Sequence, residues 1–452
     1  MELSGKRVLV FGAGRSGQGA ASLLLAAGAS PVLYDGNENL TEDKVRSQLP
    51  DDVKGIRIVT GELTQELIEN SELCVISPGV PTDIAPVNRI RSAGVKIWSE
   101  VELAWQCSKG ETVAVTGTNG KTTTVSLLGD LMKRFAGAEN THVVGNIGYP
   151  YTKAALQTDE NAVCVAEVSS FQLETIDAFH PHVSVITNIT PDHLNRHHTM
   201  EEYIRVKERI CENQTPEDIM ILNYEDEVLR QFGENIPAQG PQVWWFSSAR
   251  TLEKGMYLDG DVLKYSDGSA AVDVIHIDEL RILGKHNYEN VSAAVLSALA
   301  MGMPLDQIQE VLRAFPGVEH RIEYVGEVNG VAYYNDSKGT NVDATITALD
   351  SFEKNVILLV GGFEKGLDVT PLREHLGCVR KIIGYGLSGP RIANDLCEDP
   401  LIVDDLVQAV REAHAMAVPG DIVLLSPTTS SFDQYTGYEQ RGKHFKELVN
   451  SL

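Results

Sequence analysis

The sequence predicts an α/β protein of three domains with largely parallel sheets, and three observations support this prediction. Short apolar segments alternate with segments of helical spacing along most of the chain, which is typical of βαβ units. Several apolar segments end at a glycine-rich or polar cluster, as strands do at the ligand-binding edge of an open α/β sheet. The length of 452 residues corresponds to about three domains of ~150 residues each.

Composition restricts the class of protein and the kind of partner. The net charge of −25 argues against nucleic acid, because the phosphate backbone binds basic surfaces. Six cysteines without a Cys-x-x-Cys pair are typical of reduced thiols in the cytoplasm. Neither a secretory signal nor an apolar run of membrane-spanning length is present. We therefore expect a cytoplasmic monomer that acts on small molecules, without membrane insertion.

Residues 1–98 are predicted to form a Rossmann-like domain. A strand at Val8–Phe11 leads into Gly12-Ala13-Gly14-Arg15-Ser16-Gly17, and a second strand, Pro31–Tyr34, ends at Asp35. A glycine loop followed by an acidic residue about 20 positions later is the pattern of a dinucleotide site, so an NAD-dependent oxidoreductase is one interpretation. The same loop accepts other phosphate-bearing ligands, and a fold alone does not name its ligand. Further strands are predicted at Arg57–Val59 and at Leu73–Ile76, which stops at Ser77-Pro78-Gly79.

Residues 99–317 are predicted to form a central P-loop ATPase-like domain with a mainly parallel sheet. The apolar segment Thr112–Val115 precedes a glycine-rich turn at residues 116–124, and helical spacing continues to Phe135. A strand, a glycine-rich turn and a helix are the context of a phosphate-binding loop. Lys121 would then reach the terminal phosphates, and the Thr122 hydroxyl would bind Mg²⁺. Only two residues separate the glycines of this loop, fewer than in the general pattern, so a plain turn with an exposed lysine is the alternative.

More polar clusters follow the other predicted strands of this domain. The strands are His142–Val144, Val163–Val165 and Val183–Ile186, and the clusters after them are Asn146–Gly148, Glu167–Ser170 and Asn188–His193. Polar residues at successive strand ends indicate a binding site, whereas a single cluster would be a turn. Asn287 and Asn290 share one face of a later helix, where they either contact a purine edge or cap the helix.

Residues 318–452, after Pro316-Gly317, are predicted to form a second Rossmann-like α/β domain. Asn329-Gly330 predicts a tight hairpin turn. Strands are then predicted at Val356–Val360, Lys381–Ile383 and Ile422–Leu425. Polar clusters again lie where strands end, at Asn335–Lys338, Gly361–Lys365 and Ser426–Asp433.

Taken together and in order, these motifs resemble the Mur ligases over essentially the whole chain. The shared motifs are Gly117–Thr122 with its two-residue gap, Glu167, His286-Asn287-x-x-Asn290 and His320-Arg321. Four further motifs are similar to the branch that adds D-glutamate: Ser169–Glu174, Thr190–Leu194, Asn335–Lys338, and Ser426-Pro427 through Gln440–Gly442. Two departures concern the amino-acid site. Gly339 stands where the family usually has alanine, and Phe363-Glu364 varies the loop before Lys365.

The resemblance implies an ATP-dependent amide ligase of peptidoglycan precursor synthesis, and thus a role in cell-wall formation, cell shape and cell division. The carboxylate of UDP-N-acetylmuramoyl-L-alanine would attack the γ-phosphate of ATP to give an acyl phosphate. The amine of D-glutamate would then attack the acyl carbon and expel phosphate. Because a carboxylate and a triphosphate repel each other, cations and positioning must supply most of the catalysis.

The resemblance also implies a role for individual residues. ATP would be bound by Gly117, Thr118, Asn119, Gly120, Lys121, Thr122, Thr123, Asn287, Asn290, Arg321 and Asp336. The UDP-substrate would be bound by Arg15, Ser16, Asp35, Gly36, Ser77, Gly79, Asn146, Ser169 and His193. D-Glutamate would be bound by Thr340, Lys365, Ser431, Phe432 and Tyr438. The catalytic residues would be Lys121, His193, Lys207, Arg321 and Lys338, and two Mg²⁺ ions would be held by Thr122, Glu167, His193 and Lys207.

Lys207 is unusual in the sequence itself. The predicted helix Glu201–Glu212 has an apolar stripe, and Lys207 lies in its middle. A lysine whose stem runs out to solvent is the common explanation. Burial, however, lowers a lysine pKa, and a neutral amine can capture CO₂ as a carbamate. The resemblance implies such a carbamoylated lysine here, ligating Mg²⁺ together with His193, although a lone histidine is more often a core residue.

Three rival functions explain less of the chain. An NAD-dependent enzyme leaves the loop at residues 116–124 unexplained, and a regulatory NTPase leaves the C-terminal domain unexplained. A sister ligase that uses another amino acid, or adds glutamate to folate, is the nearest alternative. Turnover of ATP in the presence of different amino acids distinguishes these functions.

Overall fold

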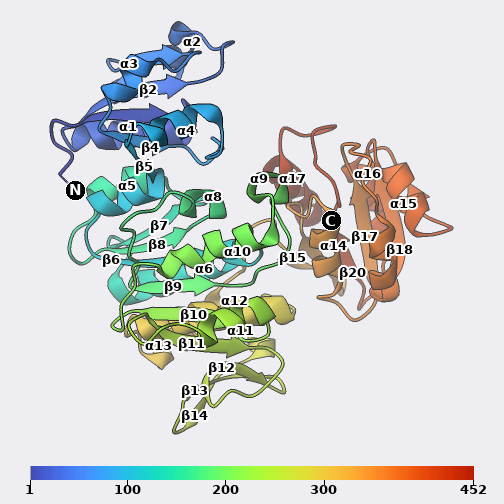
Figure 1. Cartoon of the computed structure of the whole chain (residues 1–452). Helices are drawn as coiled ribbons and strands as arrows, with labels where there is room; N and C mark the ends of the chain where they lie inside the picture. The colour runs from blue at the N-terminus through green and yellow to red at the C-terminus, as the bar shows by residue number, and fades with distance from the viewer. Residues whose placement is uncertain (1) are drawn as a thin grey trace. The chain divides into compact units, whose positions relative to one another are not determined.

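The computed structural model describes residues 2–452, which form three sheets in succession along the chain (Figure 1). The chain divides into two compact units. One extends up to Ile275 and includes Glu289–Leu312, and the other comprises His276–Tyr288 and Arg313–Leu452. The first unit contains two sheets and the second unit contains one. The predicted α/β class with mostly parallel sheets is confirmed.

The first sheet is fully parallel, with strand order β3-β2-β1-β4-β5. The order reverses between β1 and β4, and at such a reversal the loops after the two strands enclose a crevice. Its elements are β1 (Arg7–Phe11), α1 (Arg15–Ala26), β2 (Ser30–Asp35), α2 (Glu42–Gln48), η1 (Asp51–Val53), β3 (Arg57–Thr60), α3 (Gln65–Glu69), β4 (Leu73–Ile76), α4 (Ala85–Ser92) and β5 (Lys96–Ser99).

The second sheet has nine strands in the order β14-β13-β12-β11-β10-β9-β6-β8-β7. Its first part consists of α5 (Glu100–Cys107), β6 (Glu111–Thr116), α6 (Lys121–Ala136), β7 (Thr141–Gly145), α7 (Tyr151–Ala154), η2 (Ala155–Gln157), β8 (Val163–Glu167), α8 (Ser170–Leu173), β9 (Val183–Ile186), α9 (Leu194–His197), α10 (Met200–Glu208) and η3 (Arg209–Cys211). Strand β6 lies between β8 and β9 and runs parallel to both, so the loop after β6 lies between the loops that follow these strands.

The later elements were not predicted from the sequence, with the exception of α12, the helix that carries Asn287 and Asn290. They are β10 (Ile219–Asn223), α11 (Glu227–Glu234), β11 (Gln242–Ser247), β12 (Lys254–Asp259), β13 (Val262–Asp267), β14 (Ala271–His276), η4 (Ile277–Glu279), α12 (Lys285–Ala300) and α13 (Leu305–Ala314). Strands β12 and β13 pair antiparallel and carry charged residues on an exposed face, so they lack the continuous apolar run of a buried parallel strand.

The third sheet has the order β15-β16-β20-β17-β18-β19. Its elements are β15 (Glu323–Val328), β16 (Val331–Asn335), α14 (Val342–Leu349), β17 (Val356–Gly361), η5 (Thr370–Cys378), β18 (Val379–Tyr385), α15 (Gly389–Leu396), β19 (Leu401–Ile402), α16 (Leu406–Met416), β20 (Ile422–Leu425) and α17 (Tyr438–Asn450). The predicted hairpin joins β15 to β16, and both turn residues have positive φ, +54° at Asn329 and +78° at Gly330. Strands β16, β20 and β17 are parallel neighbours, so their carboxyl ends lie at one edge.

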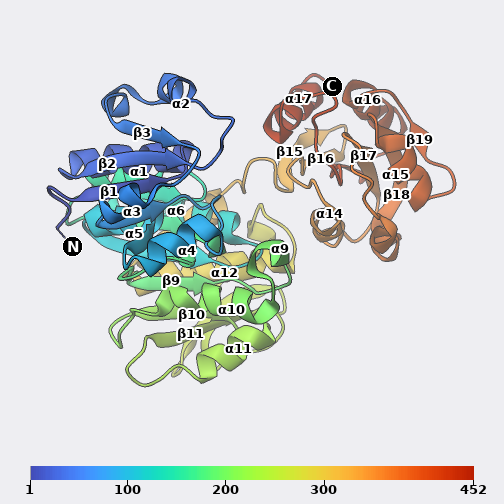
Figure 2. The same cartoon turned by 45° about the horizontal axis from the view of Figure 1, so that its top comes forward.

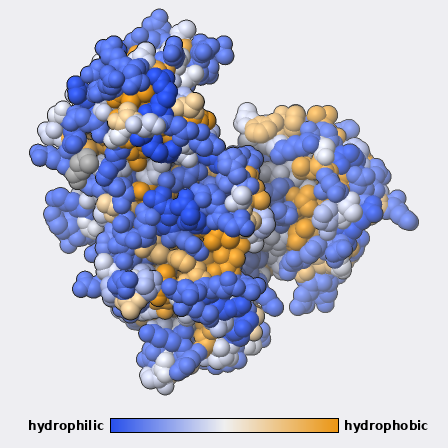
Figure 3. Space-filling model, in the orientation of Figure 1, coloured by the Kyte–Doolittle hydropathy of each residue, from blue (hydrophilic) through white to orange (hydrophobic). Residues whose placement is uncertain are grey.

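Helices cover both faces of the third sheet (Figure 2). Ile357 and Leu359 of β17 pack in one cluster with residues of α16 and α17, and Leu358 and Val360 pack in another with residues of α14 and α15. This alternation is the two-residue period of a strand that is buried on both faces. The surface in Figure 3 is mainly hydrophilic, in line with the net charge of −25. No helix among residues 2–452 combines the length and apolar character that crossing a membrane requires.

Glu100, at the start of α5, is a buried carboxylate with an incomplete set of partners. Its Oε1 accepts a hydrogen bond from Gln172 Nε2 at 2.9 Å, while its Oε2 has no partner among the described residues. Burial raises the pKa of Glu100 from 4.5 to about 7, outweighing the opposite effect of Gln172. Between these two pH values the folded chain keeps a proton that the unfolded chain releases, so stability falls as the pH rises.

We expect Glu100→Gln to flatten this pH dependence. At about 1.4 kcal/mol per pKa unit, the rise from 4.5 to about 7 corresponds to about 3 kcal/mol of stability lost between pH 4.5 and pH 8. The measurement is the melting temperature of the variant and the wild type across this range, with the exposed Glu201→Gln as a matched control. Parallel curves for the wild type and Glu100→Gln would contradict the assignment of this proton to Glu100.

Candidate active site

The loop after β6 has the backbone conformation that a phosphate-binding loop needs. Gly117 and Gly120 have φ of +141° and +84°. A Cβ at Gly117 would lie 2.0 Å from Thr187 Oγ1, and a Cβ at Gly120 would lie 2.1 Å from Asn290 Oδ1. Both positions therefore require glycine. No side chain caps the N-terminus of the 16-residue helix α6, so its first amide groups are available to an anion.

Two lysines meet at one carbonyl oxygen of this loop. Lys121 Nζ donates to the carbonyl oxygens of Gly117 and Thr118, each at 2.8 Å, and Lys207 Nζ donates to the same Gly117 oxygen at 2.7 Å. The Lys207 ammonium also lies 4.7 Å from the centre of the Tyr203 ring. Lys207 is only 2% exposed. Its side chain therefore does not extend to solvent, and the alternative of a lysine whose charged end lies in water is excluded. Burial, and then the charge of Lys121, holds the pKa of Lys207 well below its ordinary value.

Glu167, at the end of β8, is the carboxylate nearest the start of α6. Thr122 Oγ1 donates to its Oε2 at 3.0 Å, and Asn146 Nδ2 donates to its Oε1 at 2.8 Å. One carboxylate and one hydroxyl fit a Mg²⁺ ion that takes its other ligands from phosphates and water, as Mg²⁺ usually does. Among residues 2–452 no three His, Cys, Asp or Glu side chains gather closely enough to hold a metal by themselves. The residues present therefore fit an ion that arrives with a nucleotide.

His193 lies in the loop between β9 and α9, in a left-handed conformation with φ +52°. Its side chain is 49% exposed, which excludes the alternative of a core histidine. Its Nε2 lies 3.4 Å from Asp192 Oδ2, and its ring centre lies 5.0 Å from that of Phe171. In the part of the chain that the structure describes, His193 shares no hydrogen bond or ion pair with Lys207. Of the two predicted ligands of a second metal, the structure therefore places Lys207 directly on the phosphate loop.

The predicted UDP-substrate residues of the first sheet gather at one edge. Asp35 accepts hydrogen bonds from the backbone amides of Ala13, at 2.9 Å, and Asn37, at 3.0 Å. Ser77 Oγ donates to the carbonyl oxygen of Gly12 at 3.4 Å, which joins the loop after β4 to the loop after β1. The remaining predicted residues lie in these same loops or at the start of α1: Arg15, Ser16, Gly36 and Gly79.

The two asparagines of α12 have different neighbours. Asn290 is buried, and its Oδ1 accepts a hydrogen bond from Thr124 Oγ1 at 3.5 Å, beside the phosphate loop. Asn287 is also buried, and its Nδ2 donates to the carbonyl oxygen of Leu283 at 2.8 Å. The structure thus places Asn290 against the first turn of α6 within the first unit.

In the second unit, Asp336 follows β16 and is buried. It accepts hydrogen bonds from Ser426 Oγ, at 2.8 Å, and from the backbone amide of Ile322, at 3.3 Å. Burial raises the pKa of Asp336 to about 7, although Ser426 and the nearby charge of Arg321 act in the opposite direction. A Cβ at Gly339 would lie 2.2 Å from Asp336 Oδ2, so an alanine there would require the carboxylate to move. The departure at Gly339 therefore bears directly on Asp336, one of the predicted ATP-binding residues.

The predicted D-glutamate residues lie on the loops after β16, β17 and β20 and, in the case of Tyr438, at the start of α17. Lys338 Nζ lies 5.4 Å from the ring centre of the half-buried Tyr438. Ser431 is buried, and its Oγ has no hydrogen-bond partner within residues 2–452. Lys365 and Phe432 are exposed, and Thr340 is half-buried. The structure brings Lys338 and Tyr438 together, and it leaves Lys365 without a hydrogen bond or ion pair to the other predicted residues in the described chain.

Arg441 lies among these loops, and the sequence indicated it only as part of a motif. Its side chain is fully buried. It donates to the carbonyl oxygens of Ser337, at 2.8 Å, Thr429, at 3.1 Å, and Gly361, at 3.5 Å, and to Ser337 Oγ at 3.0 Å. These acceptors follow β16, β20 and β17, so one guanidinium joins all three strand ends. Tyr203, a residue of the apolar stripe of α10, also reaches the phosphate loop, because its hydroxyl lies 3.1 Å from Thr118 Oγ1.

Comparison with known families and proteins extends over the whole chain. Three family models match: the Mur ligase MurD-like N-terminal domain over residues 6–99, the Mur ligase middle domain over residues 115–298, and the Mur ligase glutamate ligase domain over residues 320–429. A UDP-N-acetylmuramoylalanine–D-glutamate ligase of Lachnospira eligens is 46% identical, with all of both chains covered. The ligase of the same name from Lachnoclostridium phytofermentans is 47% identical, covering 100% of this chain and 99% of its own.

Solved structures show the same fold at low sequence identity. The UDP-N-acetylmuramate–alanine ligase MurC of Thermotoga maritima superimposes with a TM-score of 0.59 at 19% identity, covering 99% of each chain. The MurF ligase of Thermotoga maritima, solved in complex with ADP, has a TM-score of 0.58 at 17% identity and covers 99% of this chain and 96% of its own. These structures support the architecture described above.

Proposed function

This chain belongs to the Mur ligase family, and from that membership we propose that it joins D-glutamate to UDP-N-acetylmuramoyl-L-alanine at the expense of ATP, in peptidoglycan precursor synthesis. The observation that carries the proposal is the full-length match to D-glutamate ligases together with an intact phosphate loop at Lys121. The chain would act in the cytoplasm as a monomer and contribute to cell-wall formation, cell shape and cell division.

Each part of the chain has a role in this proposal. Residues 1–98 bind the UDP moiety, through the edge formed by the loops after β1, β2 and β4. Residues 99–317 bind ATP at the phosphate loop. Residues 318–452 contribute Arg321 and Asp336 to ATP binding, and they bind the amino acid.

The first half of the reaction depends on cations around the phosphates. Lys121 and the free amides of α6 offset the charge of the β- and γ-phosphates, and Arg321 does so from the C-terminal domain. Asn146, Ser169 and His193 hold the substrate so that its carboxylate lies in line with the γ-phosphate. Thr122 with Glu167, and His193 with a carbamoylated Lys207, would hold Mg²⁺ ions whose charge further offsets that of the phosphates. The buried amine of Lys207, with its lowered pKa, fits carbamate formation.

The second half of the reaction depends on the edge of the third sheet. The D-glutamate amine attacks the acyl carbon, and Lys338 offsets the negative charge that develops on the oxygen. Thr340 and Lys365 bind one carboxylate of D-glutamate, and Ser431, Phe432 and Tyr438 surround the other. The unpartnered hydroxyl of the buried Ser431 supports this role, because a ligand carboxylate would supply its missing acceptor.

The proposal is tested by ADP formation with purified protein, ATP, Mg²⁺ and UDP-N-acetylmuramoyl-L-alanine. We expect turnover only when D-glutamate is added, and no response to L-glutamate, to other amino acids, or to NAD. Turnover that requires another amino acid would identify a sister ligase. Turnover with a folate substrate and L-glutamate would instead identify the folate branch.

Lys365 is expected to act on D-glutamate and not on ATP. Lys365→Ala should raise the KM for D-glutamate by roughly ten- to a hundred-fold, because a charged hydrogen bond contributes about 1.5–3 kcal/mol. The KM for ATP should change by less than about two-fold. Steady-state kinetics with each substrate varied in turn measures both constants. Lys354→Ala is the matched control, since Lys354 is also exposed but precedes β17 at the opposite end of the strand. Equal shifts in both KM values would contradict the assignment.

A further inference from the structure

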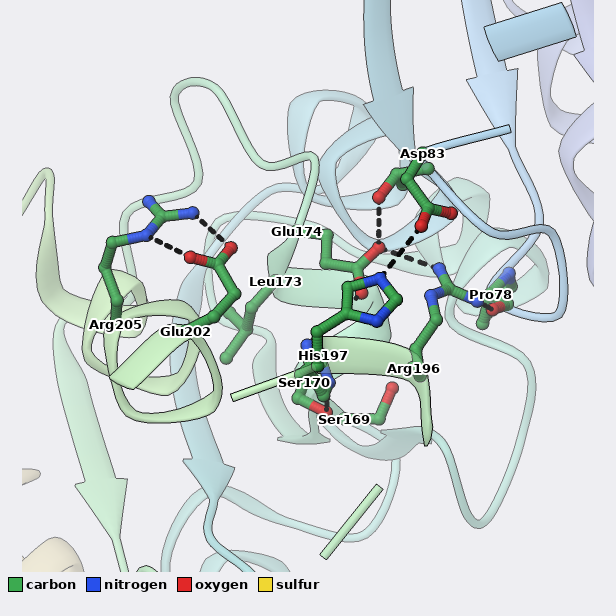
Figure 4. Close-up of polar contacts among 12 residues, drawn as sticks. Pro78, Asp83, Ser169, Ser170, Leu173, Glu174, Arg196, His197, Glu202 and Arg205 are labelled. Atoms are coloured by element: carbon green, nitrogen blue, oxygen red, sulfur yellow. Dashed lines mark hydrogen bonds and ion pairs between the residues drawn. The ribbon is translucent and has the colours of Figure 1, made fainter. Parts of the chain in front are cut away.

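Arg196, in α9, joins three segments that lie far apart in the sequence. Its Nη2 donates to Glu174 Oε2 at 2.7 Å and to the carbonyl oxygen of Val80 at 3.0 Å, and its Nη1 donates to the carbonyl oxygen of Pro78 at 3.5 Å. Figure 4 shows the guanidinium between Glu174 on one side and Pro78 on the other. One side chain of the loop after β9 thus holds the loop after β4 and the segment after β8.

Glu174 is shared by several donors in the same place. Thr82 Oγ1 donates to its Oε2 at 2.8 Å, and His197 Nδ1 lies 3.6 Å from its Oε1. His197 is almost fully buried, and its Nε2 lies 2.9 Å from Ser170 Oγ (Figure 4). The Arg196 and Glu174 side chains are 12% and 9% exposed, so water screens this pair little. Charged hydrogen bonds in such a setting are strong and directional.

The three joined segments all carry residues assigned to the UDP-substrate. The loop after β4 carries Ser77 and Gly79, the segment after β8 carries Ser169, and the loop after β9 carries His193. The Arg196 guanidinium carbon also lies 4.9 Å from the centre of the Phe171 ring, which in turn contacts His193. The spacing between these substrate residues therefore depends on where Arg196 holds the loops.

A cavity opens beside this pair. Its volume is about 370 Å³, and its lining includes Pro78, Gly79, Phe171, Asn195, Arg196 and His198. Arg196 thus forms part of the cavity wall, and its guanidinium N–H groups bind the backbone carbonyl oxygens of the loop after β4. A shift of that loop would change both the width of the cavity and the position of Ser77 and Gly79.

We propose that Arg196 and Glu174 are positioning residues that fix the substrate loop Ser77–Gly79 relative to Ser169 and His193. The inference rests on the proposed function, because it concerns the substrate named there. The two donors to the Pro78 and Val80 carbonyl oxygens orient the loop, and the carboxylate orients the guanidinium. A misplacement of about 1 Å at such a distance from the chemistry can cost about a hundred-fold in rate.

The test separates positioning from mere support of the fold. Arg196→Met removes all three hydrogen bonds of the guanidinium. Arg196→Lys keeps the positive charge but lacks the planar, forked guanidinium group. The double variant Arg196→Met/Glu174→Gln replaces the ion pair with two neutral side chains of similar volume, and the glutamine still accepts a hydrogen bond from Thr82. For Arg196→Met and the double variant we expect the KM for UDP-N-acetylmuramoyl-L-alanine to rise about ten-fold or more, with the KM for ATP within about two-fold of wild type. The lysine variant should recover only part of the loss, because a single ammonium nitrogen lacks the planar fork with which the guanidinium reaches acceptors from two nitrogens.

If Arg196→Met alone is unstable, the double variant distinguishes a positioning role from a purely structural one. A neutral replacement of a buried ion pair is often tolerated by the fold, so its melting temperature should approach that of the wild type. A purely structural role predicts that the KM recovers together with the melting temperature, and that result would overturn the inference. A positioning role predicts that the KM stays high.

Two comparisons complete the experiment. Arg205→Met removes the exposed pair of Arg205 and Glu202 on α10, also seen in Figure 4, and is expected to leave both KM values unchanged. Binding of UDP-N-acetylmuramoyl-L-alanine without ATP, measured by calorimetry, should weaken in the Arg196 variants in proportion to the KM. A wild-type protein without ligase activity would refute the proposed function, whereas an active wild type with unaltered Arg196 variants would refute only the positioning role.

Discussion

Lys121→Ala is expected to abolish ADP formation, with a loss of at least about a thousand-fold in kcat. The lysine Nζ rests on the carbonyl oxygens of Gly117 and Thr118, within reach of any phosphate that the loop encloses. Alanine removes this charge, and the buried Lys207, whose pKa lies well below its ordinary value, does not replace it. The measurement is single-turnover ADP release at saturating substrates.

A matched control lies on the same helix. Lys133 is an exposed lysine near the C-terminal end of α6, paired with Asp130, and Lys133→Ala should be as active as the wild type. Comparable melting temperatures for both variants would attribute the loss to chemistry. Full activity of Lys121→Ala would mean that the loop is only a turn, and the ATP-dependent function would then be wrong.

The second large effect is expected at Lys207. Lys207→Ala should fold and bind ATP but lose about a thousand-fold in kcat, because it would remove the negatively charged oxygen ligand that the proposed carbamate would supply. Burial and the charge of Lys121 both favour the neutral amine, which is the form that reacts with CO₂. Raising the bicarbonate concentration should not restore Lys207→Ala, whereas it should restore a wild-type sample depleted of CO₂.

The modification itself can be observed without turnover. We expect a carbamate signal in the ¹³C NMR spectrum of wild-type protein equilibrated with ¹³CO₂, and its loss in Lys207→Ala. Arg205→Ala, an exposed change two residues earlier on α10, is the control for both measurements. An unmodified amine in the wild type, together with undiminished kcat in Lys207→Ala, would rule out the carbamate.

The sequence predicted features in which chemistry and local spacing coincide. The glycines around Lys121 stand between a buried strand and a helix, which is the context of a phosphate loop, and Lys207 was conspicuous because a charge interrupted an apolar stripe. Contacts between segments that are far apart in the sequence could not be predicted from local patterns. Arg196 and Glu174 are 22 positions apart, on two loops whose separation depends on the whole sheet. The meeting of Lys121 and Lys207 at one carbonyl oxygen likewise depends on how α10 packs against the loop.

The strands β12–β14 were missed for a different physical reason. Charged residues such as Lys254, Lys264 and Asp273 interrupt the apolar runs by which the other strands were recognised. Strand β10 is a buried apolar run of the recognisable kind, and it was overlooked. In the C-terminal part the strand ends were predicted, but Arg441 was not singled out, because nothing in a local pattern shows that a guanidinium will be fully buried.

The buried guanidinium of Arg441 has a consequence for the thermodynamics of ligand binding. It fixes the backbone at the ends of β16, β17 and β20 when the chain folds, and the loops assigned to D-glutamate start from these fixed points. Binding then need not order that backbone, and immobilising a flexible side chain alone costs about 0.5–1.5 kcal/mol. D-Glutamate is small and strongly hydrated, so it makes few contacts with the protein, and these contacts could not offset an additional cost of ordering the loops. Preorganisation by one internal cation is therefore a means by which a weakly binding substrate can be held in a productive orientation.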